Sequence, residues 1–448
     1  MRKVMLFSSL GNELQEFKPI QEGKVSIYVC GPTVYNHPHI GNLRPVIVFD
    51  TWRRLFLSLG YQVTFVSNYT DVDDKIIARA KELGVSEKQL TEEVIEEFRD
   101  LVEATGSLQP DLAPKPTRYM EQMIRYIGEL VDSGAAYESE GDVYFRVSKD
   151  EDYGCLSGNT VASLISGARI DVNDQKESPV DFALWKKTDE GIRWATPWSE
   201  GRPGWHTECC VMINSIFADQ HGLIDIHGGG FDLKFPHHEN EIAQSEAHNH
   251  NRLANYWIHN GFISVDNEKM SKSLGNVILA KDVIAAYGGM PLRLMMLNTH
   301  YRAPLSFTEE TIAEASKTYA KLSLAYRQAA VALQMADIDL SSLKGEGEDA
   351  FYEQMCADLN TPNALTIALS EAKTLNQALR TRPLDLVNLS ASFARLRDYF
   401  FTLGIRVEYP QLTDEDKACY QRYLAAKATK DFAASDAYRA ALIAKGIL

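Results

Sequence analysis

The 448-residue sequence lacks several features that would place it in other protein classes. No uninterrupted apolar run is long enough to span a bilayer, and residues 1–17 contain no apolar core typical of a secretory signal. We therefore expect a cytoplasmic protein without membrane segments. The six cysteines are too few for a disulfide framework in a chain of this length. In a reducing compartment they are either buried or used chemically.

The sequence also lacks a positive net charge, internal repeats and a dinucleotide-binding fingerprint. The formal net charge of −15 argues against non-specific nucleic-acid binding, although it leaves room for a specific basic track. No Gly-x-Gly-x-x-Gly pattern follows the first predicted strand, so we do not expect a nicotinamide or flavin cofactor.

Residues 25–42 (VSIYVCGPTVYNHPHIGN) predict a strand that ends in a ligand site. A short apolar run leads to Cys30, and the stretch 39–42 opens a helix predicted over 43–59. The next strand is predicted over 62–67. Strand, helix and strand in this order indicate a parallel sheet, and open parallel sheets bind ligands at the carboxyl ends of their strands.

Polar side chains surround both turns of this unit. His37 and His39 beside a helix N-terminus suit a phosphate. After the second strand, residues 68–75 (NYTDVDDK) could hold an ammonium or hydroxyl group. Equally, Thr70 or Asp71 could cap the helix that follows.

The rest of the chain changes character several times. Residues 139–147 predict a hairpin inside an insertion that interrupts the sheet, and its tryptophans look exposed. Beyond Ser306 the sequence is helical, with four helices expected between 308 and 405. The expected domains are 1–119 (first half of a Rossmann-like parallel-sheet α/β domain), 120–200 (a connective insertion), 201–305 (its second half), 306–405 (a helical bundle) and 406–448 (a C-terminal element).

One set of residues has the chemistry of a metal site. If Pro236 begins a helix, His237 and Glu241 lie one turn apart on the same face. Together with the thiolates of Cys30 and Cys209 they form a sulfur, sulfur, nitrogen and oxygen donor set that suits zinc. Alternatively, His238 or His237 is a buried histidine with its hydrogen bonds satisfied, and Glu241 is a surface charge.

Two further motifs suit a nucleotide. The loop 269–276 (KMSKSLGN) places Lys269 and Lys272 where they could close over a polyphosphate and neutralise a leaving pyrophosphate, although a solvated basic turn is the simpler alternative. The glycines 228–230 could let a flat ring approach the backbone, and Asp232 could accept hydrogen bonds from ribose hydroxyls.

With HIGN at 39–42 and KMSKSLGN at 269–276, the chain resembles the class I aminoacyl-tRNA synthetases. Further strings make it similar to the cysteinyl-tRNA synthetases over nearly its whole length. These strings are YVCGPTVYN, SNYTDVDDK, GRPGWHTEC, HGGGFDLKFPHHENEIAQSE and ADLNTP.

The resemblance implies a role for each motif residue. The zinc ligands would be Cys30, Cys209, His237 and Glu241; the ATP-binding and catalytic residues would be His39, Asn42, Gly229, Gly230, Asp232, Lys269 and Lys272; and the residues around the substrate cysteine would be Thr70, Trp205 and His237. Asn42 stands where the family's HIGH-type motif usually ends in histidine. Cys210 adjoins the expected ligand, but the GWHxEC pattern favours Cys209.

The resemblance also implies a reaction and partners. ATP, with magnesium, and L-cysteine would give cysteinyl-adenylate, and the acyl group would then move to tRNA(Cys). One zinc ion per chain would select the substrate thiol over the hydroxyl of serine, without a separate editing domain. We expect a monomer with an anticodon-binding helical region. The family usually continues past its final Lys-Gly-Ile with a basic-aromatic tail, whereas this sequence ends at Leu448.

Three other interpretations compete with this one. A cysteine ligase of the mycothiol pathway shares the catalytic half but joins cysteine to an amino sugar, and the long helical region after residue 306 argues against it. A zinc hydrolase would leave HIGN and KMSKS without a role. A non-catalytic RNA-binding paralogue would be expected to lose the lysines or the zinc ligands, and they are present.

Overall fold

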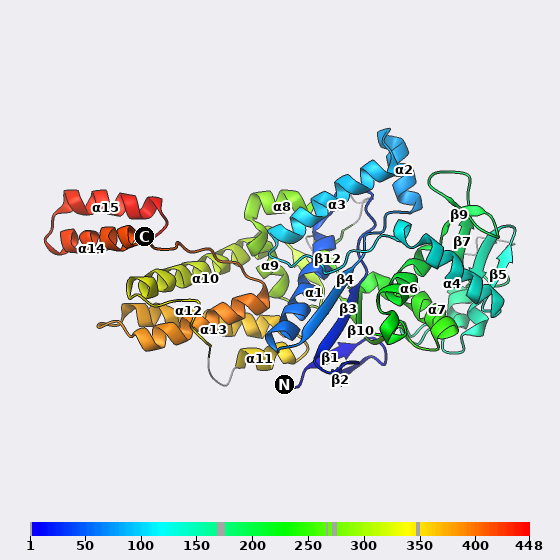
Figure 1. Ribbon diagram of the computed structural model, residues 1–448, viewed down its shortest axis with the longest axis horizontal. Coiled ribbons are helices and arrows are strands. Elements are labelled where there is room, and N and C mark those ends of the chain that lie inside the picture. The colour runs from blue at the N-terminus through cyan, green and yellow to red at the C-terminus, as the bar shows by residue number, and fades with distance from the viewer. Residues whose placement is uncertain (1, 168–174, 266–267, 271–275, 346–349) are drawn as a thin grey trace. The chain divides into compact units, whose positions relative to one another are not determined.

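The computed structural model describes all residues except 1, 168–174, 266–267, 271–275 and 346–349. The chain divides into two compact units, coloured by residue number in Figure 1. The first unit comprises Met1–Ala286 and Tyr301–Phe307, and the second comprises Tyr287–His300 and Thr308–Leu448.

A four-stranded parallel sheet forms the centre of the first unit, in the order β11-β10-β3-β4. Its strands are β3 (Lys24–Val29), β4 (Gln62–Ser67), β10 (Ile224–Gly230) and β11 (Ala254–Asn260). All three pairings are parallel, which confirms the predicted α/β fold class. Cys30 follows β3 directly and therefore lies at the edge of the sheet where ligands bind.

Helix α1 (Ile40–Ser58) connects β3 to β4 and starts three residues earlier than predicted. Its extended N-cap residue is His39, and the side-chain Oδ1 of Asn42 accepts a hydrogen bond from the His39 backbone N–H at 3.0 Å. The helix packs closely on the sheet at Gly228, where an added Cβ would lie 2.2 Å from the buried ring of Phe49. A side chain at that position would force the helix away from the sheet.

The predicted insertion contains a five-stranded antiparallel sheet in the order β5-β6-β7-β9-β8. Its strands are β5 (Ala136–Ser139), β6 (Asp142–Phe145), β7 (Phe182–Lys187), β8 (Trp194–Ala195) and β9 (Glu200–Pro203). β5 and β6 form the expected hairpin, which spans 136–145 rather than 139–147. The expectation of exposed tryptophans is wrong for Trp185, whose side chain is fully buried.

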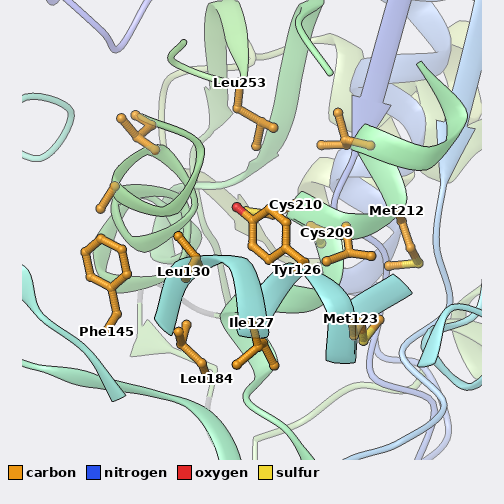
Figure 2. Packing of buried hydrophobic residues seen from close by; sticks show 14 of the residues in the cluster. Met123, Tyr126, Ile127, Leu130, Phe145, Leu184, Cys209, Cys210, Met212 and Leu253 are labelled. Carbon is orange, nitrogen blue, oxygen red and sulfur yellow. The ribbon is translucent and has the colours of Figure 1, made fainter. Parts of the chain in front are cut away.

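The insertion shares an apolar core with the sheet domain through two helices, α4 (Met120–Asp132) and α6 (Trp205–Ile216). Figure 2 shows Met123 and Ile127 of α4 beside Cys209 and Met212 of α6. Cys209 therefore sits on a helix that is held by buried packing rather than on a loop.

The other elements of the first unit are short strands and helices. They are β1 (Met5–Ser8), β2 (Glu13–Glu16), α2 (Asp74–Leu83), α3 (Glu87–Ala104), α5 (Val161–Gly167), α7 (Glu239–Asn249), β12 (Ile263–Val265), β13 (Glu268–Lys269), α8 (Ala280–Tyr287) and β14 (Leu305–Phe307). Asp73, rather than Thr70 or Asp71, caps α2, because its carboxylate accepts the N–H of Lys75. The Asp71 carboxylate instead accepts hydrogen bonds from Thr117.

The second unit is helical throughout its described residues. Its helices are α9 (Gly289–Leu297), α10 (Glu309–Met335), α11 (Ala350–Cys356), α12 (Thr361–Arg380), α13 (Leu386–Leu403), α14 (Asp414–Ala428) and α15 (Phe432–Ala444). The four helices expected between 308 and 405 are present as α10 to α13. Tyr326 of α10 stacks on Phe393 of α13 with ring centroids 4.4 Å apart. Among the described residues, no helix combines the length and apolar character that crossing a membrane requires.

Candidate active site and metal centre

A cavity of about 640 Å³ opens in the first unit at the carboxyl ends of the parallel strands. The structure brings six of the predicted site residues to its wall, namely Cys30, His39, Asn42, Trp205, Gly230 and Asp232. The predicted metal, nucleotide and amino-acid positions therefore share one cavity.

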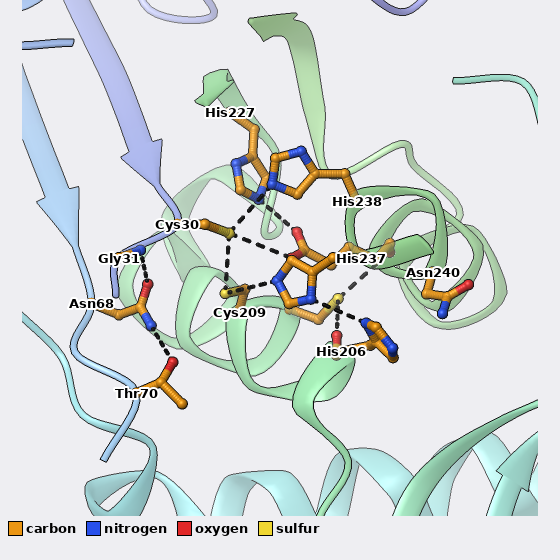
Figure 3. A network of polar contacts seen from close by, with 12 residues as sticks. Cys30, Gly31, Asn68, Thr70, His206, Cys209, His227, His237, His238 and Asn240 are labelled. Carbon is orange, nitrogen blue, oxygen red and sulfur yellow. Dashed lines mark hydrogen bonds and ion pairs between the residues drawn. The ribbon is translucent and has the colours of Figure 1, made fainter. Parts of the chain in front are cut away.

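The four predicted metal ligands lie close enough together to hold one ion, and Cys30 among them lines the cavity. Figure 3 shows Cys30, Cys209 and His237 side by side. The Sγ atoms of Cys30 and Cys209 are 3.5 Å apart, and Cys30 Sγ lies 3.7 Å from Glu241 Oε1. His237 Nε2 lies 3.8 Å from Cys209 Sγ and 2.8 Å from Glu241 Oε1. Glu241 is fully buried, so its interpretation as a surface charge is wrong.

These separations suit a tetrahedral zinc ion. Bonds of about 2.3 Å to sulfur and about 2.0–2.2 Å to nitrogen or oxygen place neighbouring donor atoms about 3.3–3.8 Å apart. Of the four separations given above for Cys30, Cys209, His237 and Glu241, three are 3.5, 3.7 and 3.8 Å. The fourth, 2.8 Å between His237 and Glu241, is a hydrogen-bonded ion pair. The donor set thus fits zinc in both chemistry and size.

Opposite charges face one another in the cluster even as bare protein. A hydrogen bond from Cys30 and the neighbouring His237 lower the pKa of Cys209 to about 6, whereas burial raises the pKa of Cys30. Burial alone would lower the pKa of His237, but Glu241 and Cys209 raise it to about 10. Because a protonated imidazole already balances these anions, a divalent cation could take the place of its proton.

Cys210 does not join the donor set. Its Sγ lies 3.5 Å from the backbone oxygen of Glu241 and 3.8 Å from that of His206. Successive residues of α6 point in different directions, so only Cys209 faces Cys30.

Four further histidines lie around the cluster, and the sequence motifs predict no functional role for any of them. His206 Nδ1 lies 3.0 Å from His237 Nδ1. His227 Nε2 lies 2.6 Å from Glu241 Oε2, and His238 Nε2 lies 3.4 Å from Cys30 Sγ. His238 Nδ1 in turn lies 2.8 Å from His259 Nε2. A pattern in the sequence could have indicated two of them, because His227 and His259 stand within the strands 224–230 and 254–260, which end at the ligand-binding edge of the sheet.

Cys30, His227, His238 and Glu241 form a second group that could hold a metal ion. We favour the group with Cys209 and His237, because the ring of His237 stacks on Trp205 in the cavity wall. In that arrangement His227 and His238 are hydrogen-bond partners of the ligands Glu241 and Cys30.

At the nucleotide end, His39 and Asn42 lie at the N-terminus of α1 and line the cavity. Arg44 of the same helix is buried and donates hydrogen bonds to the backbone oxygens of Phe262, Tyr301 and Ala303. Burial lowers its pKa to about 10, which leaves it charged at neutral pH. These bonds fix the first turns of α1 against the loop that follows β11 and the segment that precedes β14.

The glycine motif is only partly at the cavity. Gly230 and Asp232 line it, whereas Gly229 does not belong to its wall. An added Cβ at Gly229 would lie 2.8 Å from Leu233, so close packing accounts for this glycine. Lys269 belongs to the short strand β13, which pairs with β12, and Lys272 lies outside the described residues.

Of the residues predicted around the substrate cysteine, two lie together. Trp205 stacks on His237 with ring centroids 4.1 Å apart, and 39% of Trp205 is exposed at the cavity. Thr70 is buried, accepts a hydrogen bond from the Asn68 side chain at 3.2 Å and does not line the cavity. Its neighbour Tyr69 does.

This geometry has counterparts among known proteins. Residues 16–317 match the family described as tRNA synthetases class I (C) catalytic domain, and residues 350–408 match the DALR domain. A Cysteine--tRNA ligase of Acholeplasma laidlawii is 44% identical over 443 residues, which cover 99% of each chain. The chain belongs to the cysteine–tRNA ligase family. A second Cysteine--tRNA ligase of this family, from Bacillus cereus strain AH187, is 44% identical over 97% of this chain and 95% of that protein.

Solved structures show the same fold outside this family. A Mycobacterium tuberculosis methionyl-tRNA synthetase bound by methionyl-adenylate has a TM-score of 0.63 at 16% identity, covering 92% of this chain and 96% of that one. A leucyl enzyme (LeuRS) of Agrobacterium radiobacter, solved with tRNA, has a TM-score of 0.62 at 10% identity, covering 87% and 85%. The class I synthetase architecture thus extends well beyond the cysteine–tRNA ligases.

Proposed function

We propose that this chain activates L-cysteine with ATP and transfers it to tRNA(Cys) through an enzyme-bound cysteinyl-adenylate. The main support for this proposal is the position of Cys30. Cys30 belongs both to the buried donor set and to the wall of a cavity that also contains His39 and Asn42 at a helix N-terminus. A thiol held at one end therefore lies within the same cavity as a phosphate held at the other.

Cys30, Cys209, His237 and Glu241 would hold the zinc ion. When bound, zinc supplies a coordination position that a thiolate fills better than the hydroxyl of serine. A buried site that needs a specific donor rejects analogues by about 10⁴–10⁵ without proofreading. Trp205, stacked on His237 and partly exposed, would then cover the side chain of the substrate next to the metal.

The nucleotide would lie across the start of α1. His39, Asn42 and the helix N-terminus would meet the phosphates of ATP and its magnesium ion, because the positive end of the helix dipole attracts anions. Gly230 and Asp232, with Gly229 behind them, would hold the adenosine. Lys269 and Lys272 would neutralise the leaving pyrophosphate.

The tRNA would be read largely by the helical unit, since residues 350–408 match the DALR domain. We propose that the chain has five domains or segments, with the bounds 1–119, 120–200, 201–305, 306–405 and 406–448. The anticodon of the tRNA would contact the last two of them. A monomer that works in the cytoplasm is likewise proposed.

The test is whether purified, zinc-loaded protein supports cysteine-dependent ATP–pyrophosphate exchange and charges tRNA(Cys). Exchange with serine in place of cysteine should be lower by about 10⁴-fold. Absence of exchange would overturn the proposal. Exchange accompanied by transfer of cysteine to an amino sugar, and not to tRNA, would instead establish the mycothiol-type ligase.

A further inference from the structure

The imidazole of His237 is held on two sides. Trp205 stacks on the ring with an interplanar angle of 28°, and the Nδ1 atom of His206 lies 3.0 Å from the Nδ1 atom of His237 (Figure 3). His206 belongs neither to the donor set nor to the cavity wall. Its contact with His237 therefore needs a separate explanation.

The position of one proton follows from this contact. Two ring nitrogens form a hydrogen bond only when one carries a proton and the other offers a lone pair. His237 Nε2 faces Glu241 Oε1 at 2.8 Å and Cys209 Sγ at 3.8 Å, so this is the atom that would bind a metal. Its lone pair is available only when the proton of the neutral ring sits on Nδ1. His237 Nδ1–H must then donate, and His206 Nδ1 must accept.

His206 is well placed to be a fixed acceptor. It lies in the first turn of α6, and its backbone oxygen accepts a hydrogen bond from the Gln244 side chain at 2.9 Å. The ring of Phe182, from strand β7 of the insertion, packs against the imidazole edge to face with centroids 5.8 Å apart. The acceptor is therefore held by α7 on one side and by the antiparallel sheet on the other.

We propose that His206 is a positioning residue of the metal centre: by accepting the Nδ1 proton of His237, it fixes the tautomer and ring orientation that present Nε2 to the metal. The inference rests on the proposed zinc site. Partners of this kind typically change metal affinity by about 10–100-fold when removed. The insertion then contributes to thiol selection indirectly, through Phe182 and His206.

Two substitutions separate the hydrogen bond from packing. His206→Asn keeps an acceptor oxygen near the position of Nδ1, whereas His206→Leu fills the space without one. With zinc-loaded protein and an excess of a chelating dye, His206→Leu should release zinc about 10–100-fold faster than the unchanged protein, and His206→Asn within about threefold of it. After cobalt substitution, the absorption bands of His206→Leu should shift while those of His206→Asn should stay in place.

The control experiments test whether each variant still folds in the absence of metal. Thermal unfolding of both metal-free variants checks that each is folded. If His206→Leu does not fold, His206→Gln replaces it, because the glutamine oxygen lies one carbon farther out than the position of Nδ1. His206→Gln should then release zinc as fast as we expect for His206→Leu. Equal zinc release from the acceptor-lacking variant and the unchanged protein would overturn the inference, as would equally fast release from both His206→Asn and His206→Leu. Failure of the proposed function is distinguishable, because then the unchanged protein itself would show no cysteine-dependent exchange.

Discussion

The Sγ atoms of Cys30 and Cys209 lie 3.5 Å apart although the two residues are 179 positions apart in the chain. The separation exceeds the bond of about 2.05 Å in a disulfide, and it suits two thiolates that share one metal ion. The pair joins the end of strand β3 to helix α6. It therefore couples the two halves of the parallel-sheet domain on either side of the insertion.

This relationship predicts different outcomes for two adjacent cysteines. Cys209→Ala should reduce bound zinc from about one per chain to a small fraction, because it removes one of four ligands. Cys210→Ala should keep the zinc, since Cys210 Sγ faces the backbone oxygens of His206 and Glu241. Elemental analysis of both purified variants is the measurement. If Cys210→Ala lost its zinc and Cys209→Ala kept it, the ligand would be Cys210 and the proposed donor set would be wrong.

Asn42 gives a second prediction, because it has both a structural and a proposed chemical role. Asn42→Ala removes the oxygen that accepts the His39 N–H, and it should destabilise the protein by about 1 kcal/mol. Asn42→Asp keeps that oxygen but places a negative charge where we propose ATP phosphates bind. It should leave the thermal unfolding temperature nearly unchanged and raise the KM for ATP about tenfold, a difference of about 1.4 kcal/mol. An unchanged KM in Asn42→Asp would contradict the phosphate position.

The sheet and its first helix were predictable because the signals are local. Strand β4 has the predicted bounds Gln62–Ser67, and the hairpin predicted over 139–147 is present at 136–145, around a turn that the sequence indicates. The proximity of His237 and Glu241, two of the proposed metal ligands, also follows from local spacing, since they stand four residues apart.

Features that depend on tertiary packing were not predictable in this way. The burial of Trp185 and Glu241 depends on elements far away in the sequence. Gly229 looked like part of a ring-binding surface, but packing against Leu233 explains it. The histidines behind the metal ligands meet only when separate strands and helices assemble, so no single stretch of sequence indicates the contact of His206 with His237.

The KMSKS motif predicts a kinetic rather than a binding defect. Lys272→Ala should slow cysteine-dependent ATP–pyrophosphate exchange about 10²–10³-fold, because one cationic group that stabilises developing phosphate charge is lost. Cysteine binding, measured by calorimetry without ATP, should change little. Equal losses in both measurements would argue against a role confined to the transition state.

Asp150 predicts a pH dependence of stability away from the cavity. Burial, together with the charge of Glu246, raises the pKa of Asp150 from 3.8 to about 6. Because the folded pKa lies above the unfolded one, the carboxyl favours folding while protonated, and that contribution is lost as the pH rises from about 4 through about 6. Asp150→Asn keeps the oxygen that accepts the Asp152 N–H and cannot ionise. Since Asp150 is partly exposed, we expect a modest rise in Tm of about 1–3 °C at pH 7.5 and a smaller one or none at pH 4, measured by thermal unfolding. The same rise at both values would show that Asp150 does not titrate in this range.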